Sequence, residues 1–268
     1  MAEAADGLSV STRVEMLGEA VRIIDAGAER GVTLRLFGGL AVRVHCTKLE
    51  FCERDHADLD MVGLTSRRRQ ISALMKELGY HDNAVVTLAT QGRQLQFSRR
   101  CIHGDAEAHV LVHPDDHVDV FLDAFAMDHE IDLKDRLGLE RYTIPVSDIL
   151  LTKLQIFRLD GKDLRDIVTL LADLEVGERD DPDTIDGRYI ARLCAADWGL
   201  FYDVTTNLQR VGERLAAFDL TDAQQDRARR GLARLIAAID DSPKNLRWRL
   251  RARVGTRASW RNELEEQE

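Results

Sequence analysis

Two short apolar runs carry aspartates in strand-like positions, and they constrain this chain more than any other feature. The first run is Asp58-Leu59-Asp60-Met61-Val62 and the second is Val118-Asp119-Val120-Phe121. Because alternate residues of a β-strand point to the same side, Asp58 and Asp60 would share one face of a sheet. If the second strand pairs beside the first, Asp119 joins them. Two carboxylates roughly 5 Å apart repel by about 3 kcal/mol at an effective dielectric constant of about 20, so such a cluster needs compensating charge.

Divalent cations supply that charge. Mg²⁺ prefers oxygen ligands, which it commonly shares with the phosphates of a nucleotide, and Mn²⁺ accepts the same ligands. The sequence therefore predicts a metal site at Asp58, Asp60 and Asp119, with a nucleoside triphosphate (NTP) as substrate. The alternative is that these are ordinary aspartates on the solvent face of a sheet.

A pair of glycines precedes the first aspartate run. Residues Leu34–Phe37 read as a strand, Gly38 and Gly39 follow, and Leu40–His45 is compatible with a short helix. A helix start presents unsatisfied backbone N–H groups, and glycine lets a phosphate approach them closely. The pair predicts an anion site, although a tight turn would use the same residues.

These residues resemble the nucleotidyltransferase superfamily related to DNA polymerase β. Downstream, Leu151-Thr152-Lys153-Leu154 and Gly161-Lys162-Asp163-Leu164-Arg165-Asp166-Ile167 resemble the helical signature of AbiEii-type nucleotidyltransferases, the toxin halves of certain bacterial toxin–antitoxin pairs. The resemblance spans roughly residues 12–175. The chain departs from the superfamily at Gly39, where a serine that contacts the terminal phosphates usually stands.

The resemblance implies an α+β fold: a nucleotidyltransferase-like mixed sheet with flanking helices, followed by a C-terminal helical lobe. The implied domains are a catalytic domain over residues 1–147 and a helical domain over 148–268 with a basic C-terminal segment. Gly38, Gly39 and Lys153 would contact the triphosphate, and Asp163 would orient Lys153 or the nucleoside. Asp119 would also help to activate the attacking hydroxyl.

The toxin resemblance further implies a tRNA 3′ end as acceptor and a cognate antitoxin protein as partner. A protein hydroxyl, a small molecule such as an aminoglycoside, and a binding module without turnover are the alternatives. The net charge of −10 favours a cationic small molecule, whereas the basic C-terminal segment favours a nucleic acid.

That basic segment holds seven Lys or Arg residues with no acidic residue among them, and two tryptophans are interleaved. Arginines and aromatic rings can hold a phosphate backbone and stack on bases. They can equally pair with the acidic remainder of the chain. The basic residues are Lys244, Arg247, Arg249, Arg251, Arg253, Arg257 and Arg261, and the tryptophans are Trp248 and Trp260.

Four histidines suggest a rival metal site. His103, His109, His113 and His117 lie near Asp119, and histidines with a carboxylate bind zinc or non-haem iron. No HExxH motif accompanies them.

Composition excludes several classes of protein. No run of eighteen apolar residues predicts a membrane span, and the first residues do not form a secretory signal. The four cysteines include no CxxC pair, which favours reduced thiols and a cytoplasmic protein.

Periodicity predicts the remaining elements. A first helix would bury Val14, Leu17, Val21 and Ile24 and end at Gly31, and a second would bury Ile71, Leu74 and Leu78 and end at Gly79. The predicted strands are Val85–Leu88 and Gln94–Phe97 as a hairpin, then His109–His113, His117–Leu122 and, last, Arg141–Val146. Ser147 is predicted to cap a helix that carries Leu150, Leu154 and Phe157, and later helices are expected at 164–174, Tyr189–Cys194, Phe201–Leu215 and Ala223–Ile239.

Overall fold

The computed structural model describes residues 6–46, 59–98 and 117–261, with side chains from Met16 onward. The chain forms two compact units. Unit 1 consists of Met1–Ala41, Arg54–Phe125 and Asp132–Ile144, and unit 2 of Val42–Glu53, Ala126–Ile131 and Pro145–Glu268. The division into domains 1–147 and 148–268 stays a prediction.

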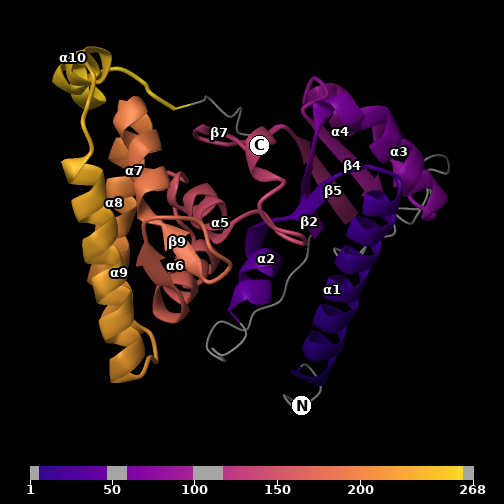
Figure 1. Cartoon of the computed structure of the whole chain (residues 1–268), viewed down its shortest axis with the longest axis horizontal. Helices are drawn as coiled ribbons and strands as arrows, with labels where there is room; N and C mark the ends of the chain where they lie inside the picture. The colour runs from indigo at the N-terminus through magenta and orange to yellow at the C-terminus, as the bar shows by residue number, and fades with distance from the viewer. Residues whose placement is uncertain (1–5, 47–58, 99–116, 262–268) are drawn as a thin grey trace, which may run out of the picture. The chain divides into compact units, whose positions relative to one another are not determined.

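Unit 1 is built on a five-stranded mixed sheet with the strand order β1-β2-β5-β4-β3 (Figure 1). The pair β2·β5 is parallel, and the other neighbouring pairs are antiparallel. A short helix, α2 (Gly38–His45), follows the first strand directly. The strands are β1 (Leu34–Leu36), β2 (Leu59–Gly63), β3 (His81–Asp82), β4 (Gln94–Ser98) and β5 (His117–Leu122).

One face of this sheet packs against helices. Gly63 of β2 lies so close to α3 (Arg68–Glu77) that an added Cβ would sit 2.8 Å from Cδ1 of Ile71. Leu34 and Val120, from the strands on either side, surround the same position. Leu34, Ile71 and Val120 are fully buried, and each buried side chain of this size stabilises the fold by about 1.5–3 kcal/mol.

The first helix, α1 (Asp6–Glu29), contacts β1 and α3. The prediction that Val21 lies on its buried stripe is wrong, because Val21 is 39% exposed. The buried face of α1 instead includes Gly27. Because glycine has no side chain, the helix packs so closely on α3 that an added Cβ would lie 3.4 Å from Cδ2 of Leu74. The buried residues of this stripe are Met16, Ala20, Ile23 and Ile24.

The predicted Val85–Leu88 strand is also wrong. Residues Ala84–Ala89 form helix α4, which begins where the Asn83 side chain accepts a hydrogen bond from Val85 N at 3.2 Å. Val85 and Leu88 are exposed, and their spacing of three residues is that of a helix. The strand that pairs with β4 is instead the two-residue β3.

The prediction of a last strand over Arg141–Val146 is wrong as well. The segment makes only an isolated bridge between Thr143 and Leu36, and helix α5 (Val146–Leu154) begins immediately after Pro145. Ser147 therefore lies inside α5 and does not cap it. Its Oγ donates to Asp180 Oδ1 at 2.6 Å and accepts from Asp186 N at 2.7 Å. Phe157 lies beyond the end of α5.

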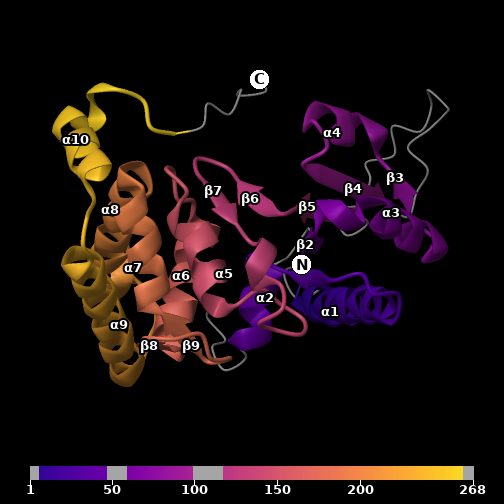
Figure 2. The same ribbon diagram turned by 45° about the horizontal axis from the view of Figure 1, so that its top comes forward.

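Unit 2 is mainly helical. Helices α6, α7, α8 and α9 contact one another, and Figures 1 and 2 show α7, α8 and α9 side by side. Their core includes Ile167, Leu171, Ile190, Val204 and Leu235. The helices are α6 (Gly161–Asp173), α7 (Gly187–Ala196), α8 (Trp198–Arg214), α9 (Asp222–Asp241) and α10 (Leu246–Val254).

Polar side chains start these helices. Asp160, Asp186 and Asp197 accept hydrogen bonds from backbone N–H groups in the first turns of α6, α7 and α8, and Thr221 forms a capping box with Gln224 at α9. Each such cap stabilises its helix by about 1 kcal/mol. Two small sheets complete the described secondary structure: β6 (Ala124–Ala126) with β7 (Glu130–Asp132), and β8 (Glu175–Gly177) with β9 (Thr184–Asp186).

The predicted α+β fold class is confirmed, since a mixed sheet with flanking helices is followed along the chain by a helical region. Within the described residues, no helix is long and apolar enough to cross a membrane.

Candidate active site on the open face of the sheet

Asp60 and Asp119 lie opposite each other at the centre of the sheet. They are register partners on the parallel strands β2 and β5, and residues paired in this way point to the same face. Their neighbours Leu59, Met61, Val118 and Val120 are buried on the opposite face. The alternation of buried and part-exposed residues therefore fixes both carboxylates on the face away from α3. Asp58, the third predicted carboxylate, lies outside the described residues.

Gly38 contacts one of these aspartates. A Cβ built on Gly38 would lie 2.6 Å from Oδ2 of Asp60, closer than a real side chain can approach. Gly38 also has φ of +73°, a conformation that favours glycine. Phe37 N donates to the Asp60 backbone oxygen at 2.9 Å, so the start of α2 and the centre of β2 are held together. The start of α2 presents backbone N–H groups at this point.

Two glutamines hold Asp119. Gln94 and Gln96 of β4 each donate a side-chain N–H to Oδ1 of Asp119 at 3.0 Å. Among the described residues, Oδ2 of Asp119 accepts no hydrogen bond. The carboxylate is thus oriented by one oxygen and can present the other to a ligand.

A cluster of three phenylalanines borders this face. Phe37, Phe121 and Phe125 contact one another edge to face, with ring centroids 5.0–5.2 Å apart. Phe121 follows Asp119 by two residues on the same strand, so it shares the face with the carboxylates. Each edge-to-face pair stabilises the fold by about 0.5–1.5 kcal/mol beyond its buried area. The cluster forms a rigid apolar edge to the site.

The donor set fits a divalent cation, because carboxylate oxygens are the ligands that Mg²⁺ and Mn²⁺ take. The Gly38–Asp60 contact bears on the fit, since only a residue without a side chain lets Oδ2 of Asp60 lie against the start of α2. In the part of the chain that the structure describes, no group of three or more His, Cys, Asp or Glu is placed to hold a metal. Asp60 and Asp119 are the two residues of the predicted carboxylate set that the structure describes.

Lys153 and Asp163, two further predicted site residues, lie together in unit 2. Lys153 Nζ of α5 lies 2.7 Å from Oδ1 of Asp163 and 3.2 Å from Oδ2 of Asp166, both on α6. Burial disfavours the charged ammonium, but the charges of Asp166 and Asp163 outweigh it and raise the pKa of Lys153. The three groups carry a net charge of −1. The Lys153 ammonium has three N–H donors, and these two carboxylates take two of them.

Comparison with known proteins adds weak likeness to solved structures. No protein family matches the chain, and no curated protein matches it in sequence. A solved structure of the antibiotic-resistance factor ANT(2″)-Ia is similar at 12% sequence identity, over 60% of this chain and 83% of that one, with a TM-score of 0.35. A likeness of this size assigns neither a family nor an activity to the chain.

The basic C-terminal segment divides into two groups of residues. Three basic residues are engaged within unit 2. Lys244 donates to the backbone oxygens of Ile239 and Asp240, Arg251 to those of Gly255 and Ala258, and Arg261 forms two hydrogen bonds to Asp203. The other four arginines are exposed and form no ion pair with any described residue: Arg247, Arg249, Arg253 and Arg257.

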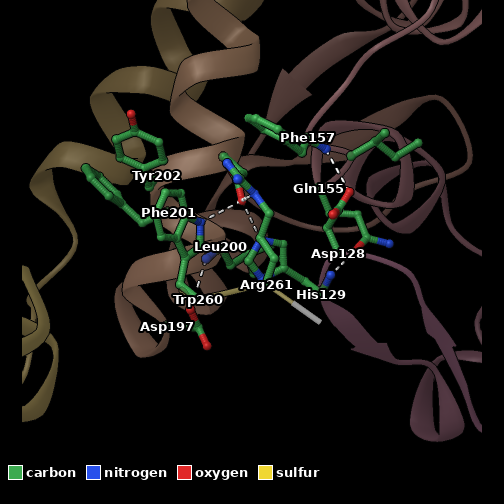
Figure 3. Close-up of polar contacts among 12 residues, drawn as sticks. Asp128, His129, Gln155, Phe157, Asp197, Leu200, Phe201, Tyr202, Trp260 and Arg261 are labelled. Carbon is green, nitrogen blue, oxygen red and sulfur yellow. Dashed lines mark hydrogen bonds and ion pairs between the residues drawn. The ribbon is translucent and has the colours of Figure 1, made fainter. Parts of the chain in front are cut away.

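Asp203 anchors the end of this segment, which includes Trp260 and Arg261 (both labelled in Figure 3). It accepts hydrogen bonds from Trp260 Nε1 at 2.9 Å and from Arg261 Nη2 at 2.6 Å, and His129 Nε2 lies 2.8 Å from Oδ2. Burial alone would raise the pKa of Asp203, but the hydrogen bonds from His129, Arg261 and Trp260 lower it. Asp203 is only 2% exposed, so the group is structural. Trp248 is also held internally, since its Nε1 donates to the Cys194 oxygen at 3.0 Å.

The rival histidine site is described only in part. His117 lies on β5, whereas His103, His109, His113 and the predicted strand His109–His113 lie outside the described residues. Cys52 and Cys101 lie outside them as well, and Cys46 and Cys194 are buried.

Sequence reasoning missed Gln94 and Gln96, and it included Asp166 only as part of the helical signature and not as a site residue. The glutamines alternate on a predicted strand, and that spacing could have placed them on the face of Asp119 once the strand order was known. Asp166 stands three residues after Asp163, on the same side of a helix, and its pairing with Lys153 could have been inferred from that spacing.

Proposed function

We propose that this chain is a nucleotidyltransferase that moves a nucleoside monophosphate from an NTP to a macromolecular acceptor, with Mg²⁺ or Mn²⁺ as cofactor. One observation supports the proposal above others: Asp60 and Asp119 are register partners on adjacent parallel strands, and Asp60 lies against a glycine at a helix start. Two carboxylates on the same face of adjacent strands repel each other. A cation that accompanies a nucleotide would offset that repulsion.

The residues have distinct roles in this reaction. Asp60 and Asp119, with Asp58, would hold the cation, which when bound offsets negative charge on the attacking and leaving oxygens. The backbone N–H groups at Gly38 and Gly39 would bind the triphosphate. Oδ2 of Asp119 would accept the proton of the attacking hydroxyl, because Oδ1 is already held by Gln94 and Gln96.

In the proposed transfer, one bond to phosphorus forms as another breaks. The acceptor oxygen bonds to the α-phosphorus, the bond from that phosphorus to the bridging oxygen breaks, and pyrophosphate leaves with the electron pair. The acceptor proton passes to Asp119. Lys153, oriented by Asp163, is proposed to contact the triphosphate as a point charge.

For the acceptor we propose a tRNA 3′ end, and for the biological role the toxin of a toxin–antitoxin pair whose antitoxin is a further protein. The support is the resemblance of the Lys153 and Asp163 segments to AbiEii-type toxins, together with the four exposed arginines of the C-terminal segment. A protein hydroxyl and an aminoglycoside-type small molecule are alternative acceptors with the same chemistry.

The test incubates the protein with Mg²⁺ and each α-³²P-labelled NTP, and offers tRNA, cell protein and aminoglycosides in separate reactions. Label is expected in tRNA. Label in protein or drug would keep the transferase and change the acceptor, and no label in any of them would overturn the proposal.

Three variants test the site. Asp60→Asn and Asp119→Asn are each expected to lower labelling by about 100-fold or more, the lower range for loss of a general base. Asp82→Asn is the matched control, because Asp82 pairs with Phe97 and Phe97 with Val118, which places it on the opposite face of the same sheet. Equal labelling by all three variants would exclude the carboxylates from the chemistry.

A further inference from the structure

A small basic pocket opens in unit 2. It has a volume of about 350 Å³, which lies in the lower range for pockets that bind small ligands. It combines three guanidinium groups with apolar side chains. The lining residues are Phe157, Arg158, Leu159, Leu164, Arg210 and Arg214.

Two elements build this pocket: the loop between α5 and α6, and the end of α8. Asn207 of α8 donates to the backbone oxygens of Leu154 and Ile156 at 2.9 and 2.6 Å, which fixes the loop on the helix. Arg210 donates to the Phe157 oxygen at 3.0 Å and to Asn207 Oδ1 at 3.1 Å. The arginine pocket is thus held in shape by hydrogen bonds that need no ligand.

Two of the arginines that line the pocket lie on α8. Arg210 and Arg214 stand one helical turn apart, a spacing at which like charges destabilise a helix. Neither forms an ion pair with a carboxylate in the described ranges. Asp160, which follows Leu159, is used instead as the cap of α6 and accepts from Lys162 N and Asp163 N at 2.7 and 2.8 Å. Two neighbouring arginines without an ion pair among the described residues are unexpected in a chain with net charge −10.

The shape and chemistry of the pocket suit one kind of anion. Guanidinium groups bind phosphate with two parallel hydrogen bonds each, and arginine is favoured over lysine where that geometry matters. Leu159 and the buried Leu164 would contact the carbon skeleton to which the phosphate is attached. The Phe157 ring is covered on one face by Arg261, whose Cζ lies 3.4 Å from its centroid (Figure 3).

We propose that this arginine pocket binds a phosphate group carried by a nucleotide or by RNA. The inference goes beyond the proposed function, because it needs neither the sheet carboxylates nor any transfer. Its site lies on unit 2, whereas Asp60 and Asp119 lie on unit 1.

The experiment measures binding to the full chain by calorimetry in the presence of EDTA, so that no divalent cation contributes. The probes are inorganic pyrophosphate, ATP, and an RNA oligonucleotide with and without a 5′-phosphate. Saturable pyrophosphate binding is expected. Tighter binding of ATP would identify a nucleotide, and tighter binding of the phosphorylated RNA would identify a polynucleotide.

Variants decide whether the pocket is responsible. Arg214→Ala and the double variant Arg210→Ala with Arg214→Ala are expected to weaken binding at least about 10-fold, as loss of a charge-assisted pair implies. Arg214 makes no hydrogen bond to a described residue, so its replacement leaves the loop contacts of Arg210 intact. Arg230→Ala, an exposed arginine of α9, removes the same charge elsewhere and is expected to change binding by less than about twofold.

Two results would overturn the proposal: the absence of pyrophosphate binding at millimolar concentration, or equal binding by the wild type and the double variant. Asp60→Asn serves as the second control. It is expected to bind pyrophosphate normally even where it abolishes nucleotidyl transfer, so failure of the phosphate site and failure of the proposed function give different outcomes.

Discussion

A methyl group on Gly38 would lie 2.6 Å from Oδ2 of Asp60. Two features therefore require glycine at this position: the lack of space beside the carboxylate and the φ of +73°. The two requirements tie the start of α2 to β2, because neither residue can be enlarged or moved without disturbing the other.

Replacing Gly38 by alanine should separate these two contributions. We expect Gly38→Ala to lower the free energy of unfolding by about 2–3 kcal/mol, of which about 1 kcal/mol reflects the positive φ. Gly31→Ala is the control, because Gly31 has φ of +67° but no atom within 4 Å of an added Cβ. Urea unfolding of both variants gives the comparison. Equal losses of stability would mean that Asp60 moves freely away from Gly38.

Lys153 balances two carboxylates in unit 2, so its removal should be costly. We expect Lys153→Met to lower the free energy of unfolding by about 3 kcal/mol, since Asp163 and Asp166 would remain without a cation in a largely buried place. The variant that also carries Asp163→Asn and Asp166→Asn should recover much of that loss. Lys134→Met is the control, because Lys134 is half exposed and lies 3.8 Å from Asp123. A change as small as that of the control would refute the structural role of Lys153.

The ion pairs of Lys153 also make the free energy of unfolding depend on pH. The pKa of Lys153 is raised in the folded protein, so its contribution is complete below the unfolded value of 10.5 and is lost as pH rises through the folded value. The difference in stability between wild type and Lys153→Met should therefore be constant near neutral pH and shrink above pH 10.5. A difference that stayed constant as pH rose above 10.5 would contradict this assignment.

The part of the site on β2 and β5 could be predicted from sequence because strand periodicity is local. Alternation around Asp60 and Asp119 placed each aspartate on the polar face of its own strand, and the pairing of the two strands is confirmed. The role of these aspartates in catalysis stays a prediction. The contacts from Gln94 and Gln96 could not be predicted, since they depend on which strand lies beside β5.

The wrong predictions of secondary structure have a common cause. A short apolar segment can be read either as a strand or as part of a helix. The apolar run from Val85 to Leu88 is short enough to be predicted as a strand. Asn83 instead caps a helix at this point, and the side chains of Val85 and Leu88 are exposed. In α1, Val21 fits a helical stripe that is offset from the real one. The close approach at Gly27 decides which stripe faces the protein, and that approach is a long-range contact with α3.

Arg261 and Asp203 form the strongest attachment of the C-terminal segment in the described structure. A double-mutant cycle with Arg261→Gln and Asp203→Asn should give a coupling free energy of about 1–3 kcal/mol at pH 7, because the pair is largely buried and forms two hydrogen bonds. The exposed pair Arg179–Asp181 is the control, and its cycle should give a coupling close to zero.

The coupling between Arg261 and Asp203 should also disappear in acid. The pKa of Asp203 is lowered in the folded protein, so its contribution is complete above the unfolded value of 3.8 and is lost as pH falls through the folded value. Urea unfolding of wild type and Asp203→Asn between pH 7 and pH 2 measures this. A stability difference that persisted at the lowest pH would mean that the charge on Asp203 does not hold the segment.

Cys194 should resist modification in the folded protein. Burial, aided by the charge of Asp197, raises the pKa of its thiol to about 12. Only the thiolate reacts with iodoacetamide, so at pH 8 the reactive fraction is about 1000-fold smaller than for a thiol with a pKa of 9. Mass spectrometry should find Cys194 unmodified in native protein and alkylated in urea.

Because the folded pKa is raised, ionisation favours the unfolded chain above pH 9, and alkylation of Cys194 should increase with the unfolded population there. Rapid alkylation at pH 8 under native conditions would instead show that the α7 end, where Trp248 binds the Cys194 oxygen, opens without global unfolding.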